Sequence, residues 1–337
     1  MIIVTFQVKK EICSFIPTTK YKRRAKIKGM KKSPKRVVFM GSPDFAVPAL
    51  KLLAGKYLVV GVVTQPDRPA GRGRTLMAPP IKEAALELGL PLLQPEKLRQ
   101  PEVFQQLSQW EPDVIVVAAF GMILREEVLD LAPFGCINIH ASLLPRWRGA
   151  APIQACILAG DAETGITIIK LDSGVDTGPL LNQKTIPVGL KDTGGSLFDK
   201  LAGLGGELLM DTLPGYLSGK IIPQSQDNSL ATYAPMLRKE EGNLNFNESA
   251  ENLARRVRAF NPWPGTYTLL NELPLKIHAA HHESGSSNPG KRSVSNGKPA
   301  ISTSAGLLVL DEVQPPGRKT MSGKAFLIGA RDWLESK

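Results

Sequence analysis

Cysteine and long hydrophobic runs are scarce in this sequence. The three cysteines, Cys13, Cys136 and Cys156, have neither the close spacing of a zinc site nor the density of a disulfide scaffold. They are expected to be reduced thiols that fill a core rather than act as nucleophiles. No segment approaches the roughly 18 consecutive apolar residues of a membrane span. These absences predict a soluble, cytoplasmic protein.

An excess of positive charge is missing from most of the chain, although the net charge is +11. Residues 1–36 hold 12 of the 42 Lys and Arg residues against a single acid, Glu11. The remaining residues carry 30 basic and 30 acidic side chains, so they are neutral overall. The basic character therefore does not by itself indicate that the folded part binds nucleic acid.

The basic extension, residues 1–33, shows no clear apolar periodicity and is expected to be disordered. It has three interpretations: an arm that touches nucleic acid, a targeting peptide rich in Arg and poor in acids, or a stretch upstream of a true start at Met30. The third is favoured, because Met30 is followed by Lys31, Lys32 and Ser33 just before the first strand-like segment.

Two phosphate-binding motifs are also absent. The first strand-like segment ends in Gly41-Ser42-Pro43-Asp44, which lacks the G-x-G-x-x-G spacing, and no G-x-x-x-x-G-K-[ST] occurs. This argues against a dinucleotide or ATP site.

Strand-like and helical segments alternate through the first half of the chain. Strands are predicted at 37–40, 57–64, 113–120 and 136–140, with helices at 45–54, near 80–89, 101–109 and 122–131, and at about 192–218. This alternation predicts an α/β fold with an open, doubly wound sheet, whose ligands bind at the carboxyl ends of the strands.

The chain is expected to form two domains, with a catalytic domain over 34–219. A polar, irregular linker follows over 220–238. Residues 239–337 offer one helix, at 247–260, and short apolar runs divided by Gly, Ser, Asn and Pro, with a long loop at 283–299. This pattern predicts a small C-terminal β-barrel.

The segment Cys136-Ile137-Asn138-Ile139-His140 carries the first candidate chemistry. Side chains alternate across a strand, so Asn138 and His140 project from the same face at the mouth of the sheet. A histidine at a strand end is often only a hydrogen-bonded structural residue. Its neighbours along the chain favour a catalytic role.

Two turns follow that strand. Ser142-Leu143-Leu144-Pro145-Arg146-Trp147-Arg148-Gly149 is a loop shaped by Pro and Gly, and residues 171–179 form a tight acidic turn. An Asp in this turn could orient His140 and support its protonated form. Alternatively, Asp172 and Asp176 make only Asx-turns. The triplet Asp176-Thr177-Gly178 also matches aspartic proteases, but that chemistry needs two such carboxylates.

A loop from Asp67 to Arg74 contains three arginines, Arg68, Arg72 and Arg74, among glycines. Such a basic finger suits phosphates and stacked bases. The alternative is a solvated, charged loop.

Asn138-x-His140, the loop from Ser142 to Gln154, and Asp176 resemble the catalytic constellation of the folate-dependent formyltransferases. Four further stretches, FMGSPDFAVPAL, TQPDRPAGRGRTL, GDAETGITI and RAFNPWPGTY, are similar to members of this family that act on methionyl-tRNA. The resemblance runs from about residue 36 to the carboxyl end. Residues 1–33 depart from it.

The resemblance implies a Rossmann-like catalytic domain, an OB-fold-like C-terminal domain that binds tRNA, and 10-formyltetrahydrofolate as the formyl donor, without a metal. It implies that Asn138 and His140 stabilise an oxyanion and that Asp176 orients His140. It assigns the folate site to Ser142, Leu143, Leu144 and Pro145. It also favours Arg68, Arg72 and Arg74 as tRNA contacts, because this insertion distinguishes the members that act on tRNA.

The expected activity is formylation of initiator methionyl-tRNA by a monomer. Two alternatives remain. One is a formyltransferase for a small amine such as glycinamide ribonucleotide, which would need neither the C-terminal domain nor the arginine-rich loop. The other is a folate- or RNA-binding module without catalysis, against which the presence of all three polar residues argues.

Overall fold

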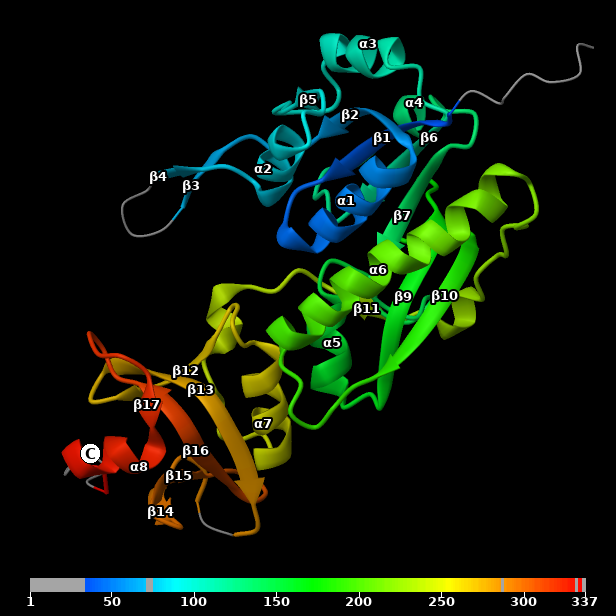
Figure 1. Ribbon diagram of the computed structural model, residues 1–337. Helices are drawn as coiled ribbons and strands as arrows, with labels where there is room; N and C mark the ends of the chain where they lie inside the picture. Colours follow the sequence, from blue (N-terminus) through cyan, green and yellow to red (C-terminus); the bar gives the residue numbers. More distant parts are fainter. Residues whose placement is uncertain (1–33, 71–74, 286–287, 331–332, 335–337) are drawn as a thin grey trace, which may run out of the picture. The chain divides into compact units, whose positions relative to one another are not determined.

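The structure is a computed structural model that describes residues 34–70, 75–285, 288–330 and 333–334 (Figure 1). The predicted extension, residues 1–33, and the arginines Arg72 and Arg74 lie outside the described residues. Within these ranges, no helix has the length and apolarity needed to cross a bilayer.

A seven-stranded sheet forms the centre of the N-terminal part of the described chain (Figure 1). Its order is β10 (Leu180–Pro187), β9 (Glu163–Lys170), β7 (Cys136–His140), β6 (Val114–Ala118), β1 (Arg36–Gly41), β2 (Leu58–Val63) and β5 (Leu92–Leu93). The strands from β7 to β5 are parallel, whereas β9 and β10 are antiparallel to their neighbours. The predicted Rossmann-like α/β class is confirmed, and β9 and β10 extend it with an antiparallel edge.

Helices cover both faces of this sheet (Figure 1). They are α1 (Val47–Lys56), after the short η1 (Asp44–Ala46), α2 (Pro80–Glu87), α3 (Pro101–Gln109), α4 (Glu126–Leu129), α5 (Pro152–Ala159) and α6 (Gly194–Leu217). A proline in the first turn begins α1, α2, α3 and α5, where its missing N–H costs nothing. A capping box between Thr193 and Ser196 begins α6.

Alternation along β1 divides the core between the two faces. Val37 and Phe39 pack in one cluster, with residues of α1, α2, α5 and α6. Val38 and Met40 pack in the other, with residues of α3 and α4. Each such fully buried side chain contributes about 1.5–3 kcal/mol. The carboxyl ends of the strands are thereby held rigidly in place.

The two described cysteines belong to this core. Cys136 and Cys156 are fully buried, which confirms their predicted role as core fillers. Burial raises the pKa of Cys136 to about 12 and that of Cys156 to about 11. Neither forms a reactive thiolate near neutral pH. Cys13 lies outside the described residues.

The C-terminal part contains an antiparallel sheet, which confirms the predicted C-terminal β-domain, while its closure into an OB-fold-like barrel stays a prediction (Figure 1). Its strands are β12 (Thr266–Leu270), β13 (Leu273–Glu283), β14 (Arg292–Ser295), β15 (Lys298–Ser302), β16 (Leu307–Gln314) and β17 (Met321–Ser322). Two helices, α7 (Ala250–Ala259) and α8 (Gly323–Gly329), accompany them. Leu253, Ile277 and Leu310 are among the residues of its own hydrophobic core.

Three details of the sequence prediction are wrong. Only one helix is predicted after residue 239, at 247–260, but α8 is a second one. The helix predicted at 122–131 is only α4, because Gly121 takes a φ of +74° and Arg125 is extended. The loop predicted at 283–299 contains β14 and the start of β15. Asn296 and Gly297, with φ of +49° and +73°, form the tight turn between these strands, as Asn-Gly in hairpins does.

Helix α7 ends inside the core of the N-terminal part. Ala259 and Phe260 are buried in the same cluster as α1 and α6. The Asn261 carbonyl accepts a hydrogen bond of 2.9 Å from the Gly195 backbone N–H, at the start of α6. Two parts of the chain that are distant in sequence therefore share one hydrophobic core.

The predicted linker holds two short elements, η2 (Asn228–Leu230) and β11 (Tyr233–Ala234), before η3 (Lys239–Gly242). Strand β11 pairs in parallel with β8 (Arg148–Gly149), which lies in the loop after β7. The segment between 220 and 238 therefore packs against the loop that follows the strand carrying Asn138 and His140.

Candidate active site

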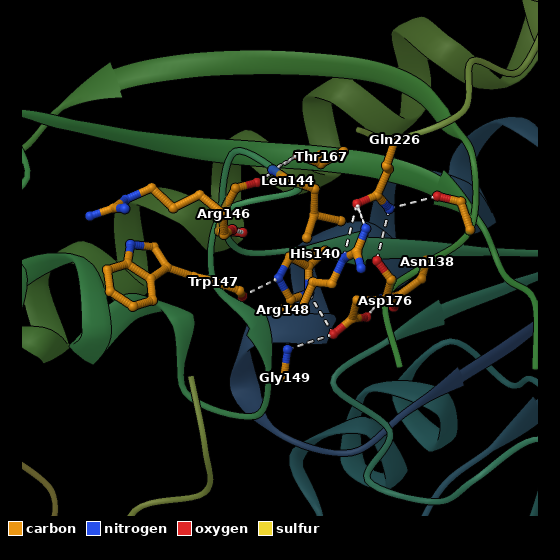
Figure 2. A network of polar contacts seen from close by, with 12 residues as sticks. Asn138, His140, Leu144, Arg146, Trp147, Arg148, Gly149, Thr167, Asp176 and Gln226 are labelled. Atoms are coloured by element: carbon orange, nitrogen blue, oxygen red, sulfur yellow. Dashed lines mark hydrogen bonds and ion pairs between the residues drawn. The ribbon is translucent and has the colours of Figure 1, made fainter. Parts of the chain in front are cut away.

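The carboxyl end of β7 gathers the polar residues that the sequence singled out (Figure 2). Asn138 and His140 project from the same face of the strand, as its alternation predicts. The acidic turn between β9 and β10 brings Asp176 to them. The His140 side chain is 6% exposed and that of Asp176 is 13% exposed, so their interaction is largely shielded from water.

Three nitrogen atoms surround the Asp176 carboxylate (Figure 2). The Gly149 backbone N–H donates to Oδ2 at 2.9 Å, and Nδ1 of His140 lies 3.5 Å from the same oxygen. The Asn138 amide donates to Oδ1 at 3.5 Å. An ionised carboxylate suits this environment, because it can accept from every neighbour.

The contact of the second ring nitrogen of His140, Nε2, indicates where one hydrogen of the ring is carried. Nε2 lies 3.0 Å from the Trp147 carbonyl oxygen. A carbonyl only accepts, so Nε2 carries a hydrogen in this arrangement. Nδ1 faces the Asp176 carboxylate, which accepts from any hydrogen carried there.

The two aspartates of the acidic turn, Asp172 and Asp176, have different hydrogen-bond partners. Asp172 Oδ1 accepts from the Gly174 N–H at 3.0 Å and from the Thr177 hydroxyl at 2.6 Å, which is an Asx-turn. Asp176 has a φ of +53° and directs its carboxylate toward β7. The structural alternative therefore applies to Asp172, while Asp176 faces the imidazole.

Glycine is required at position 149. Its φ is +113°, and a Cβ there would lie 2.6 Å from the carbonyl oxygen of Ala234. The absence of a side chain lets β8 approach β11 closely enough for the Ala150 N–H to donate to the same carbonyl at 2.8 Å. This approach also aims the Gly149 N–H at Asp176.

The loop that begins at Ser142 is braced by β9. Ser142 is fully buried, and its hydroxyl donates to the Arg146 carbonyl at 2.6 Å. Thr167 donates to the Ser142 carbonyl at 2.6 Å and accepts from the Leu144 N–H at 3.0 Å. Leu143 and Pro145 are half-buried, so they are the members of the predicted folate segment whose side chains remain accessible.

An ion pair between Arg146 and Asp161 also holds this loop. Arg146 binds both carboxylate oxygens of Asp161, at 2.7 and 2.9 Å, and its guanidinium stacks 4.3 Å from the Trp147 ring. Burial favours the neutral form of Asp161, but the hydrogen bonds from Arg146 and Trp147 outweigh it and lower the pKa of this carboxyl. The carbonyl of Trp147 is thus held firmly beside His140.

Arg148 and Gln226 were missed in the sequence. Arg148 is 2% exposed, and its Nη2 donates to the Gln226 Oε1 at 2.7 Å. The Gln226 amide nitrogen donates to the carbonyls of Asp176, at 2.8 Å, and Gly178, at 2.7 Å (Figure 2). Arg148 lies in the loop from Ser142 to Gln154 that carries the family resemblance. Nothing in the polar linker distinguished Gln226 from its neighbours.

A pocket of about 710 Å³ opens beside the carboxyl end of β6. Its lining includes Met122, Ile123, Val128 and Phe104 with the basic residues Arg99 and Arg125. Lys97, Glu96 and Glu127 line it as well, so it combines apolar walls with charges of both signs. No group of three or more His, Cys, Asp or Glu side chains in the described ranges could hold a metal ion.

Of the predicted tRNA contacts, only Arg68 lies in the described chain. It is exposed and begins β3 (Arg68–Ala70), which pairs with β4 (Thr75–Met77) in a hairpin. Its role in binding stays a prediction, as do those of Arg72 and Arg74.

Comparison with known proteins identifies the class to which this fold and site belong. The model of the formyl transferase family matches residues 35–213, and the model of the formyl transferase C-terminal domain matches residues 236–331. The chain belongs to the formyl transferase family.

Particular relatives are more specific. The methionyl-tRNA formyltransferase of Myxococcus xanthus is 48% identical over 87% of this chain and 95% of its own length. That of Marinobacter nauticus is 46% identical over 89% and 97%. Among solved structures, a sugar 3N-formyl transferase superposes with a TM-score of 0.62 at 17% identity over 85% of this chain and 99% of its own. The methionyl-tRNA formyltransferase of Clostridium thermocellum superposes with a TM-score of 0.51 at 17% identity, over 82% and 99%.

Proposed function

We propose that the protein transfers the formyl group of 10-formyltetrahydrofolate to the α-amino group of initiator methionyl-tRNA, giving N-formylmethionyl-tRNA. The observation that carries the proposal is similarity, over almost the entire chain, to relatives that are methionyl-tRNA formyltransferases. This similarity includes the C-terminal domain, so the alternative of a small amine such as glycinamide ribonucleotide is not favoured.

Asn138 and His140 supply the hydrogen-bond donors that the reaction needs. When the amine attacks the formyl carbon, negative charge develops on the formyl oxygen, and each well-placed donor is worth roughly 10² to 10³ in rate. The Asn138 amide makes a long contact of 3.5 Å with Asp176, so it can turn toward a bound substrate at little cost. The N–H at Nε2 of His140, which faces the Trp147 carbonyl, can instead donate a hydrogen bond to the formyl oxygen.

Asp176 stabilises positive charge on His140 and takes part in the transfer of the amine proton. The bond between the amine and the formyl carbon forms while the bond from that carbon to the folate nitrogen breaks, and one proton moves from the amine to the folate nitrogen. The Asp176 carboxylate stabilises a protonated His140 and accepts a proton from the attacking amine before passing it on. General acid–base help of this kind contributes about 10² to 10⁴.

The two substrates would approach from different elements. The apolar walls of the pocket beside β6 suit a flat ring, and its basic residues Lys97, Arg99 and Arg125 outnumber Glu96 and Glu127, which favours a ring with an acidic tail. Leu143 and Pro145 are the accessible part of the predicted folate segment. Arg68, Arg72 and Arg74 would meet the phosphates of the tRNA.

The proposal is tested by incubating the protein with 10-formyltetrahydrofolate and charged initiator methionyl-tRNA, and measuring N-formylmethionyl-tRNA. Glycinamide ribonucleotide and uncharged tRNA serve as parallel acceptors. Formyl transfer to the charged tRNA alone supports the proposal. Transfer to the ribonucleotide in its place, or to none of the three, would overturn it.

A further inference from the structure

We propose that Gln226, in the segment between the two domains, is a positioning residue that holds the Asp176 carboxylate in its reactive place. This inference rests on the proposed function. It starts from the position of Asp176 in a turn whose tip is open to solvent, where Val175 is 67% exposed. A carboxylate on such a turn needs an anchor from outside the turn.

Gln226 provides that anchor at the base of the turn. One amide nitrogen donates to two carbonyls, those of Asp176 and Gly178, at 2.8 and 2.7 Å. The first carbonyl belongs to the left-handed residue itself, whose φ of +53° sends the carboxylate toward His140, and the second lies two residues further along the turn. Losing both hydrogen bonds frees the backbone conformation on which the direction of the carboxylate depends.

The orientation of the Gln226 amide is determined by its partners. Carbonyls can only accept and a guanidinium can only donate, so Nε2 must face the turn and Oε1 must face Arg148. Arg148 contributes two hydrogen bonds to Oε1, at 2.7 and 3.1 Å, and a third of 2.7 Å to Asn228. The buried guanidinium thereby fixes the amide, and the amide fixes the turn.

The same turn is held from its other side by β8. The Gly149 N–H, adjacent to Arg148 in sequence, donates to Asp176 Oδ2 at 2.9 Å. The backbone of Asp176 is therefore held by the linker and its side chain by the loop after β7. The Gly149 amide reports directly on whether the carboxylate is in place.

Gln226→Glu separates positioning from stability. The new carboxylate still accepts from Arg148, as a stronger, charged pair, but it cannot donate to the two carbonyls. We expect kcat to fall about 10- to 100-fold, as the loss of two neutral hydrogen bonds would allow, with KM near wild type and a smaller fall in melting temperature than in Gln226→Leu, because the bonds from Arg148 are kept. Gln226→Leu removes both functions and should lower kcat and the melting temperature together.

Gln224 offers a matched control two residues away. Its side chain is exposed, and its backbone bonds to Leu180 do not depend on the side chain. Gln224→Glu and Gln224→Leu repeat the same chemical changes on the same segment. Both should leave kcat, KM and melting temperature unchanged.

The decisive measurement is hydrogen exchange at the Gly149 amide, followed by NMR in the full-length chain. Faster exchange with a lower kcat in Gln226→Glu, and neither change in Gln224→Glu, supports the inference. Unchanged exchange and kcat in Gln226→Glu would overturn it, as would a kcat loss that only tracks a fall in melting temperature. If the wild type transfers no formyl group, the proposed function fails, and the Gly149 exchange alone decides whether Gln226 positions Asp176.

Discussion

Replacing Asp176 with Asn removes one charge and, apart from the long contact of 3.5 Å from Asn138, keeps the hydrogen bonding of the side chain. Asn tolerates the left-handed backbone found at this position, where φ is +53°, and its carbonyl can still accept from the Gly149 N–H. The amide group, however, cannot stabilise a protonated imidazole. The substitution therefore isolates the electrostatic contribution of the carboxylate.

The structure gives the size of that contribution. The carboxylate lies 3.5 Å from Nδ1 of His140, and both side chains are largely buried. At an effective dielectric constant of about 20, two unit charges at this distance attract by about 5 kcal/mol, and each loss of about 1.4 kcal/mol slows a reaction tenfold. Since Asp176 is still partly exposed, we expect kcat to fall by about 10² to 10³, with folate affinity nearly unchanged.

The assay is single-turnover formylation of methionyl-tRNA, with folate binding measured separately. Asp172→Asn is the matched control, because that carboxylate makes only the Asx-turn with Gly174 and Thr177, which Asn can also make. It should retain full activity. Turnover of Asp176→Asn within about threefold of wild type, less than about 0.7 kcal/mol in the barrier, would refute the electrostatic role of the carboxylate.

Three further predictions follow. Gly149→Ala should destabilise the protein by at least about 1–3 kcal/mol and lower kcat, since φ is +113° there. The control Gly203→Ala, whose added Cβ would meet nothing within 4 Å, should not lower the melting temperature. Equal melting curves for the two variants would contradict the steric argument. Burial opposes the charged form of His281, but its hydrogen bond to Asp311 raises the His281 pKa above its usual 6.5. The charged His281 therefore stabilises the folded protein fully below pH 6.5, and this stabilisation is lost as the pH rises through the raised pKa. His281→Gln should therefore lower the melting temperature at about pH 6 but hardly at about pH 9, and a loss independent of pH would disprove the linkage. Arg72→Ala should sharply reduce kcat/KM for methionyl-tRNA at fixed ionic strength without changing folate affinity, and Arg72→Lys should recover only part of it; wild-type kinetics for Arg72→Ala would remove the arginine from the tRNA site.

Local patterns in the sequence were enough to place two polar side chains together, because strand alternation puts Asn138 and His140 on one face. They also predicted the acidic turn, but the choice of Asp176 over Asp172 came from the family resemblance. The roles of Asn138, His140 and Asp176 in the reaction stay predictions. The turn at Asn296-Gly297 also had a clear signal, which the abundance of Ser and Gly around it obscured.

Other features depend on contacts that no local pattern encodes. Gln226 lies 50 residues from Asp176 in sequence, and its neighbours in the linker are equally polar. The helix predicted over 122–131 is shortened because Gly121 adopts a left-handed conformation that its apolar surroundings do not foretell. Tertiary packing decided both cases.

The contacts of the predicted linker, residues 220–238, limit how proteins of this family can be recombined. The two family models stop at residue 213 and resume at 236, so Gln226 and Thr232 belong to neither. Yet Thr232 accepts from the Trp147 N–H at 2.9 Å, beside His140. A chimera joined near residue 219 would replace these partners with a foreign segment, whereas a junction after 238 would keep them. Exchange of the C-terminal domain should therefore preserve catalysis only when the crossover lies beyond the linker.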